Sequence, residues 1–314
     1  MKRFLKILKW TGIVILLLIS IATVVVASRQ NLKYDVPYPD IIASKDSVVI
    51  ARGKHLVYGP AHCIICHGPA NSESLLLKGE NIPLTGAHAF DLPVGTVYSK
   101  NITPDEETGI GKYTDGEIAR ALRYGVHPDG KAVFDFMPFH NLSNADLTAV
   151  ISYLRAQKPV KNKVPENKLN LMGYIVKAFM VKPVGPDEPI RDSVKIDSSA
   201  EYGKYIAMNI ANCNGCHTLR DMSGAYIGEP FAGGGAFKEP GKTTLYPPNL
   251  TPDSSSRIFG WSQDDFIHRF RQGKIIEHTH MPWNCFNQMN DDELKAIYKF
   301  LKTLKPAKTT VQKE

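Results

Sequence analysis

The strongest hydrophobic signal in the chain is an uncharged run near its start, residues 10–27, which is rich in Ile, Leu and Val. Its 18 residues are enough to cross the hydrocarbon core of a bilayer as a helix. Four basic residues precede the run: Lys2, Arg3, Lys6 and Lys9. This excess of positive charge predicts a cytoplasmic N-terminus, with everything after Ser28 on the outer face. Residues 1–30 are expected to be a retained membrane anchor, although Val25-Val26-Ala27 is an acceptable cleavage site and leaves a signal sequence open.

Beyond this run, the pattern of apolar positions is helical. Helices are expected over residues 47–58 and 200–209, and two more begin at the N-cap residues Thr114 and Ser262, each followed by acidic residues. Two closing helices open at residues 143–146 and 290–293. Their apolar faces recur every three or four residues. The stretches between are rich in Gly and Pro and are expected to be loops. Because no strand signal is strong enough to argue for a sheet, the predicted fold class is all-α.

An internal repeat organises these elements in the same order twice. The matched segments are Gly53-Lys54 with Gly203-Lys204, 98–105 with 246–253, 113–125 with 261–273, Met137-Pro138 with Met281-Pro282, and 146–154 with 292–301. The roughly 285 residues after the anchor are enough for two hydrophobic cores. We therefore expect two tandem domains, residues 45–160 and 200–308, joined by a linker over 161–199.

Composition adds only mild constraints. The chain is 43% hydrophobic and 22% charged, with a net charge of +7, of which four positive charges flank the anchor. The other basic residues are dispersed, which argues against a nucleic-acid partner. A weakly basic face is instead typical of a protein that meets an acidic redox partner or anionic lipid.

The most specific motif occurs once in each repeat. Cys63-Ile-Ile-Cys66-His67 and Cys213-Asn-Gly-Cys216-His217 share the C-x-x-C-H spacing of c-type haem attachment. In each copy both thiols are expected to form thioethers to one haem, and the histidine to ligate its iron. A structural zinc site would use the cysteines but would leave both histidines unexplained. A redox dithiol of the thioredoxin type would require a preceding strand and a βαβ setting. The sequence thus predicts two covalently bound haem c groups, and an exported location agrees with haem c chemistry.

The methionines narrow the choice of sixth iron ligand. Met137 is the one methionine between His67 and the linker, so a methionine-ligated first haem uses it. In the second repeat Met222 follows the attachment motif too closely, which leaves Met281 and Met289, and the repeat favours Met281. A lone methionine is otherwise ordinary core filler. His/Met ligation raises the reduction potential and leaves no open position, which suits electron transfer.

Other side chains are rivals for the iron. Eight further histidines are expected mostly on the surface: His55, His62, His88, His127, His140, His268, His278 and His280. Of these, His278 and His280 lie closest in sequence to Met281. Cys285, which remains after four cysteines are used, is expected to be buried, or else to ligate the second iron as a thiolate and indicate sulfur chemistry.

Two sets of matched residues have both a haem-related and a structural interpretation. Arg123 and Arg271 each precede a glycine by two residues and are expected either to neutralise haem carboxylates or to be solvated. The other set is expected either to hold a loop against the haem edge or to serve ordinary turn chemistry. It comprises Asn101, Asn249, Tyr98 and Tyr246.

The linker contains an apolar stretch, residues 169–181, which is too short to span a bilayer. One interpretation places it on the membrane surface, with Lys177 and Lys182 near lipid headgroups. The favoured interpretation packs it across the two domains, where it would hold the haems close together.

The order of helix, C-x-x-C-H, long loop, Met-Pro and closing helix resembles class I cytochromes c. The Asn-Ile-Thr-Pro-Asp loop at 101–105 and the Thr-Asp-Gly-Glu-Ile helix start at 114–118 are similar to the cytochrome c subunits of membrane-bound alcohol and sugar-acid dehydrogenases. The resemblance covers about residues 45–306, with a gap at the linker. Such subunits often carry three haems, whereas this chain has two attachment sites.

Together these features predict a dihaem cytochrome c, single-pass in the bacterial inner membrane, with both haem domains in the periplasm. It is expected to pass electrons from a dehydrogenase towards a terminal oxidase or a soluble carrier, without catalytic residues of its own. The alternative is a dihaem enzyme, of peroxidase or thiosulfate-oxidising type, with one labile or unusual axial ligand. A haem-based sensor is disfavoured because few residues precede the hydrophobic run.

Overall fold

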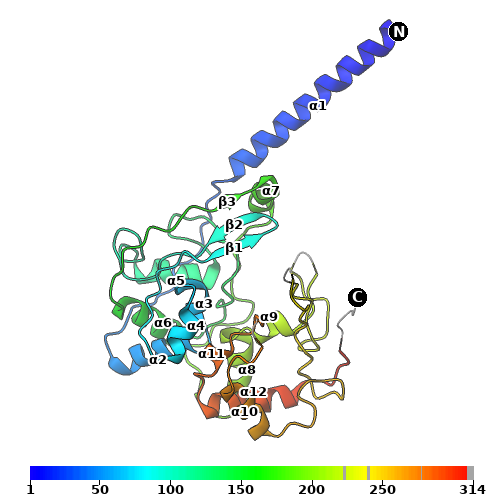
Figure 1. The fold of residues 1–314 in the computed structure, drawn as a ribbon. Helices are drawn as coiled ribbons and strands as arrows, with labels where there is room; N and C mark the ends of the chain where they lie inside the picture. The colour runs from blue at the N-terminus through cyan, green and yellow to red at the C-terminus, as the bar shows by residue number, and fades with distance from the viewer. Residues whose placement is uncertain (222–223, 239–240, 277, 310–314) are drawn as a thin grey trace.

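The computed structural model describes residues 1–221, 224–238, 241–276 and 278–309. Its first element, α1 (Lys2–Arg29), projects away from the rest of the chain (Figure 1), and none of its residues is buried. The mean hydropathy of its most apolar 18-residue window is 2.6, which makes α1 a candidate membrane span by length and composition. The apolar N-terminal helix expected from the sequence is therefore present.

Residues 45–160, the N-terminal repeat, contain five helices among the described residues. They are α2 (Ser47–Tyr58), α3 (Cys63–His67), α4 (Ser72–Leu77), α5 (Asp115–Tyr124) and α6 (Asn144–Ala156). The expected caps are confirmed, since the Thr114 hydroxyl accepts from the backbone N–H of Glu117 and Ser143 caps α6 in the same way. These side chains satisfy backbone donors that a helix N-terminus leaves unpaired.

The described helices of residues 200–308, the C-terminal repeat, keep the order of opening, C-x-x-C-H, capped and closing helix, with a short extra helix before the last. They are α8 (Ala200–Tyr205), a π-helical turn (Ile206–Ile210), α9 (Cys213–His217), α10 (Gln263–Arg271), α11 (Trp283–Phe286) and α12 (Asp291–Thr303). Ser262 and Asn290 cap α10 and α12 through capping boxes. The opening helix ends within one residue of its expected limit, with a π-helical last turn.

A glycine lies at the crossing of the opening and closing helices in each repeat. At Gly53 in α2 an added Cβ would lie 1.9 Å from the backbone oxygen of Ala149 in α6. At Gly203 in α8 it would lie 1.9 Å from the backbone oxygen of Ala296 in α12. Only glycine allows the two backbones to approach this closely. The matched Gly-Lys pairs of the sequence repeat therefore mark two equivalent helix crossings.

The all-α prediction is wrong in one region, because the N-terminal repeat carries a small sheet. It consists of β1 (Ala89–Leu92), β2 (Gly95–Tyr98) and β3 (Lys168–Leu169) in the antiparallel order β1-β2-β3. The paired strands have at most four residues each, too short for an alternating pattern to be recognised. β3 comes from the linker, about 70 residues later, so local sequence carries no sign of this pairing.

The linker has two parts with different contacts. α7 (Leu171–Phe179) packs against the end of α1 and the β1–β2 turn, and not between the repeats as the favoured interpretation expected. The polar segment after it bridges both repeats, since Asp187 bonds Asn141 at 2.5 Å and Glu188 accepts from Asn209 at 3.1 Å. Lys182 is exposed, whereas Lys177 is half-buried.

We expect Gly53→Ala and Gly203→Ala each to lower the free energy of unfolding by about 2 kcal/mol, because overpacking outweighs the ~1 kcal/mol gain in helix propensity. Gly235→Ala is the matched control, since its Cβ would meet nothing closer than 3.8 Å. Denaturant unfolding of the haem-loaded variants, followed by circular dichroism, measures the effect. Unchanged midpoints at both crossings would contradict the close packing.

Candidate functional site

The two C-x-x-C-H segments have the same local backbone. α3 and α9 each span the five motif residues, and each begins directly after a residue in the left-handed region, His62 at φ 40° and Asn212 at φ 50°. A non-glycine residue in this region is uncommon. One turn of helix then places both cysteines of a motif on neighbouring positions of one face. The structure therefore repeats the attachment geometry as well as its sequence.

Each motif histidine is oriented by a backbone carbonyl. The Nδ1–H of His67 donates to the carbonyl of Lys100, and that of His217 to the carbonyl of Pro248, both at 2.7 Å. A carbonyl can only accept, so the proton lies on Nδ1 and the Nε2 lone pair is available to a metal. Burial lowers the pKa of both imidazoles, which keeps the rings neutral. The sequence did not indicate these carbonyls, although both lie one residue before a matched asparagine.

Those asparagines serve turn chemistry. The Asn101 side-chain oxygen accepts from the Thr103 amide at 3.0 Å, and its amide donates to the carbonyl of Val160 at 2.9 Å. Asn249 makes the equivalent bonds to Thr251 at 2.8 Å and to the carbonyl of Ala307 at 2.7 Å. Each asparagine thus ties the histidine-orienting loop to the segment that follows the closing helix. The structural interpretation of this pair is the one that the contacts support.

Met137 and Met281 occupy equivalent turns. The amide two residues later donates to the methionine carbonyl in both repeats, from Phe139 at 2.9 Å and from Trp283 at 2.8 Å. Pro282, at φ −78° and ψ 61°, has the dihedrals of an inverse γ-turn. Both methionines are half-buried against the hydrophobic core. The proline of the Met-Pro pair therefore has a structural role, because it fixes the turn that carries the methionine side chain.

An aromatic stack lies next to each of these turns. Phe90 stacks on Phe136, the residue before Met137, with ring centroids 5.4 Å apart. Phe237 stacks on His280, the residue before Met281, with centroids 4.7 Å apart. Phe90 and Phe237 hold equivalent places, since each pairs with the residue just before a matched tyrosine. The N-terminal repeat forms a hairpin here and the C-terminal repeat a single bridge, but the stack is kept.

These residues fit a covalently bound haem. Burial raises the pKa of Cys63 and Cys213 to about 12, so both are neutral thiols. Arg123 is 3% exposed, and its Nε and Nη1 have no partner among the described residues. A buried unpaired guanidinium is costly unless an anion lies beside it, as a haem carboxylate would. Arg271 differs, because its guanidinium is satisfied by the carbonyls of Asn287 and Met289 and by Asp291.

The other candidate iron ligands differ in their contacts. Most of the histidines have other contacts: His55 with Glu293, His62 with Pro60, His88 with Phe90, His127 with Asp129, His140 with Asp135 and His268 with Gln272. His278 is the exception, since its buried Nε2 lacks a partner among the described residues. Met289 is a fully buried core residue, and Met222 lies outside the described residues.

Cys285 is fully buried, and burial raises its pKa, so it is a neutral thiol. It lies close enough to Cys63 and Cys66 to interact with them electrostatically, which places it beside the attachment helix of the N-terminal repeat. Its surroundings offer no support for the thiolate ligand of the second iron considered from the sequence.

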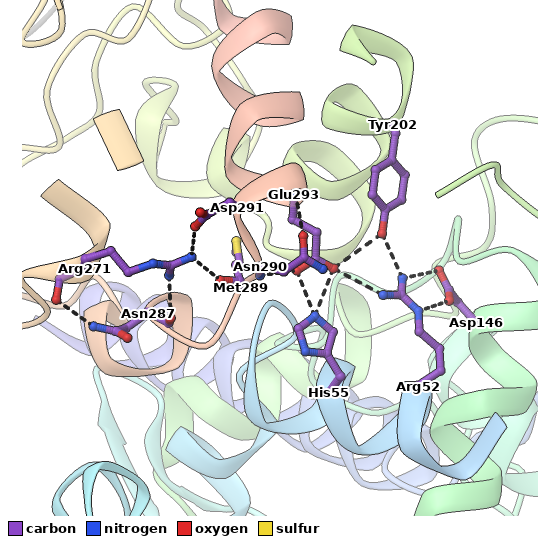
Figure 2. Close-up of polar contacts among 10 residues, drawn as sticks. All are labelled: Arg52, His55, Asp146, Tyr202, Arg271, Asn287, Met289, Asn290, Asp291 and Glu293. Carbon is purple, nitrogen blue, oxygen red and sulfur yellow. Dashed lines mark hydrogen bonds and ion pairs between the residues drawn. The ribbon is translucent and has the colours of Figure 1, made fainter. Parts of the chain in front are cut away.

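A buried polar network joins the two repeats (Figure 2). Glu293, at the start of α12 and 1% exposed, accepts from His55 at 2.8 Å and from Arg52 at 3.2 Å, both on α2. Arg52 also pairs with Asp146 of α6 at 2.9 Å, and Tyr202 of α8 receives a bond from it at 3.2 Å. Four helices from the two repeats thus meet at one cluster. A buried cluster of this kind specifies a single arrangement of the elements that supply it.

The charges in this network reinforce one another. For Glu293, burial would raise the pKa, but hydrogen bonding from His55 and the charge of Arg52 hold it below its ordinary value of 4.5. For Arg52, burial opposes the charged form, but Asp146, Tyr202 and Glu293 together outweigh burial and raise the pKa. The ionised forms of these residues are therefore the ones that the fold stabilises.

A second contact joins the two candidate haem sites more directly. α11, which follows the Met281 turn, packs on α4 beside the first attachment motif. His62, next to Cys63, meets the ring of Phe286 edge-on, with centroids 5.6 Å apart. Lys274 and Glu73 form an ion pair across the same boundary at 3.1 Å. The methionine loop of one repeat therefore lies against the attachment motif of the other.

Comparisons with known proteins show which sequences this chain resembles. Residues 200–305 match the family model Cytochrome c. The chain is 30% identical over 280 residues to an alcohol dehydrogenase (quinone), cytochrome c subunit, of Gluconobacter oxydans, covering 82% of this chain and 55% of that protein. It is 27% identical over 296 residues to the gluconate 2-dehydrogenase cytochrome c subunit of Pantoea cypripedii, covering 85% and 62%. It is 24% identical over 269 residues to a diheme cytochrome c-type protein of Cereibacter sphaeroides, covering 80% and 84%.

The C-terminal repeat therefore belongs to the cytochrome c family, and such a domain implies covalently bound haem c. The expected resemblance to cytochrome c subunits of alcohol and sugar-acid dehydrogenases is confirmed. The chain spans about half the length of the Gluconobacter relative, 55% of it.

We expect Glu293→Gln to lower the free energy of unfolding at pH 7 by about 3 kcal/mol, because it leaves Arg52 and His55 without their shared carboxylate. Glutamine can still make the hydrogen bond of the helix cap, so the loss of stability measures the contribution of the carboxylate charge. Asp292→Asn is the matched control on the same turn, since Asp292 is exposed and, among the residues that the structure describes, pairs only with Lys295, at 3.2 Å. Its effect should be within about 0.5 kcal/mol.

The same network predicts a pH dependence. The folded pKa of Glu293 is depressed, so its contribution is complete above the unfolded value near 4.5 and is lost as pH falls through the folded pKa. The gap between wild type and Glu293→Gln should therefore close in acid. A gap that is constant across this range, measured by denaturant unfolding, would contradict the ionised network.

Proposed function

We propose that the chain is an electron-transfer cytochrome c with two haem c groups, one in each of two domains, residues 45–160 and 200–308, joined by the linker 161–199. The observation that carries this proposal is the duplicated site. Each C-x-x-C-H histidine donates from Nδ1 to a carbonyl at 2.7 Å, and each Met-Pro turn has the same backbone bond. Two separate segments with one geometry are expected of two sites with one chemistry.

In the first site Cys63 and Cys66 bind the haem through thioethers, and His67 and Met137 are the axial ligands. In the second site the thioethers come from Cys213 and Cys216, and the axial ligands are His217 and Met281. The bound haem supplies a one-electron exchange between ferrous and ferric iron. The thioether is a neutral soft ligand that favours ferrous iron, and the histidine's carbonyl bond fixes the ring orientation and raises its basicity.

The relative position of the two sites supports transfer between them within one molecule. Glu293, Arg52 and Asp146 hold the repeats together, and the His62–Phe286 contact lies directly between the two ligand-bearing segments. Because this boundary is packed and bonded rather than hinged, the distance between the haems is fixed by the fold. The chain then acts as a two-step electron path.

Residues 1–30 form a retained single-pass anchor in the bacterial inner membrane, and both haem domains lie in the periplasm. The support is the exposed, apolar α1 and the four basic residues that precede its apolar run. Haem c attachment on the export side requires the same orientation of the chain.

The electron donor is a dehydrogenase, and the acceptor is a terminal oxidase or a soluble carrier. This assignment follows the names of the relatives, which include cytochrome c subunits of alcohol, gluconate and fructose dehydrogenases. It makes the chain an electron-transfer subunit or carrier, with the substrate chemistry performed by its partner.

The ligand assignment predicts separate changes in the two midpoint potentials. Met137→His should lower one potential, and Met281→His the other, each by on the order of 0.2 V within the roughly 0.8 V range that axial ligands span. Cys285→Ser and the isosteric core variant Met289→Leu should leave both potentials in place. Potentiometric titration of the full-length protein measures all four variants.

Loss of the methionine charge-transfer band in the ferric spectrum provides the second readout. Half of this band should disappear in each histidine variant. A shifted potential in Met289→Leu, with none in Met281→His, would contradict the assignment for the second haem. Substitution of His278, whose Nε2 is unpartnered among the described residues, should also leave the band intact.

A further inference from the structure

α7 is amphipathic, but its apolar face points away from the protein, whereas a packed surface helix turns that face inward. Leu171 is 77% exposed, Ile175 39% and Phe179 44%, and these residues follow one another at four-residue spacing along one face. The face towards the protein instead carries the buried small residues Gly173 and Ala178. A soluble helix normally buries its apolar stripe. An apolar stripe that faces outward is typical of a surface that meets another apolar phase.

The orientation of α7 is fixed by its inner face. Asn170 caps the helix by accepting from the Gly173 amide at 2.9 Å and donates to the carbonyl of Pro93 at 2.8 Å. A Cβ at Gly173 would lie 2.0 Å from the oxygen of Val94, so the helix backbone rests on the β1–β2 turn. Rotating α7 to bury its apolar stripe would break these contacts. The contacts of the inner face therefore hold the apolar stripe outward.

α7 is also bonded to the end of α1. Arg29 donates to the carbonyl of Ala178 at 2.8 Å, and Gln30 donates to the carbonyl of Tyr174 at 2.9 Å. The Arg29 guanidinium lies over the Phe179 ring, 5.1 Å from its centroid. Figure 1 shows α7 beside the point where α1 leaves the body of the protein. The position of α1 in a membrane would thus determine the position of α7.

The charges that flank the apolar run of α1 define that position. The run of 18 residues, 10–27, rises by about 27 Å as a helix, close to the thickness of a hydrocarbon core. Lys9 then lies at one membrane surface and Arg29 at the other. Because α7 bonds Arg29 and Gln30, its depth is that of the lipid headgroups on the outer face.

We propose that α7 lies in the outer lipid–water boundary, with its apolar stripe against the acyl chains. The occupant of this stripe is a lipid surface, which supplies apolar chains for Leu171, Ile175 and Phe179 and phosphate groups near Arg29 and the exposed Lys182. The proposal rests on the anchoring by α1 given above. Its consequence is that the protein touches the membrane at two joined points, which turns the N-terminal repeat towards the bilayer and the C-terminal repeat away from it.

The test uses the full-length, haem-loaded protein in vesicles of phosphatidylethanolamine and phosphatidylglycerol. A nitroxide is attached to Ile175→Cys, and in a second variant to Leu171→Cys, so that a folding failure of one does not end the experiment. Collision rates with oxygen, which partitions into lipid, and with a water-soluble nickel chelate report the surroundings of each label. Ile196→Cys, at an exposed apolar residue near the end of the linker, is the water control, and Val24→Cys in α1 is the lipid control.

The proposal predicts several-fold higher oxygen than nickel accessibility at positions 171 and 175, as at 24, and the reverse at 196. Labels at 171 and 175 that match 196, with 24 still in lipid, would place the stripe in water and overturn the proposal for α7 alone. A label at 24 that is open to nickel would overturn the anchoring as well.

Discussion

Each repeat depends on the close crossing of its opening and closing helices. Gly53 and Gly203 let the crossing backbones touch, and an added Cβ would meet a carbonyl at 1.9 Å in both cases. The opening helix leads directly into the C-x-x-C-H turn, and the Met-Pro turn lies on the chain that returns to the closing helix. The asparagine-centred loop is tied to the residues just after that helix. The crossing therefore sets the frame that positions the C-x-x-C-H histidine and the Met-Pro methionine of each repeat.

The contacts between the two repeats hold the two candidate sites in one fixed arrangement. Arg52, Glu293 and Asp146 are separated by up to 241 positions in sequence, yet they form one buried cluster. Removing charges from water is costly, so such a cluster persists only where its partners are well satisfied. The His62–Phe286 contact belongs to the same boundary, which links the stability of the boundary to the electron path that we propose.

Much of this could be predicted from the sequence, because the relevant signals are local. The caps at Thr114, Ser143, Ser262 and Asn290 act on amides three residues away, and the C-x-x-C-H spacing is contained in five residues. The β1–β2–β3 sheet could not be predicted, since its strands are short and one comes from the linker. The carbonyls that orient His67 and His217 carry no side-chain signal at all. The apolar character of α7 is evident from the sequence, but only its contacts with Arg29 and Val94 reveal which way its apolar stripe faces.

The central claim is that both irons are held by two protein ligands and exchange electrons without binding a substrate. The most direct measurement is to reduce the full-length protein anaerobically, add carbon monoxide and record the haem absorption. Six-coordinate His/Met haems have no vacant position, so the account predicts no spectral change at either site. Rapid binding of carbon monoxide to one of the two haems would reveal an open or labile ligand and would contradict the assignment of this chain as a pure electron carrier.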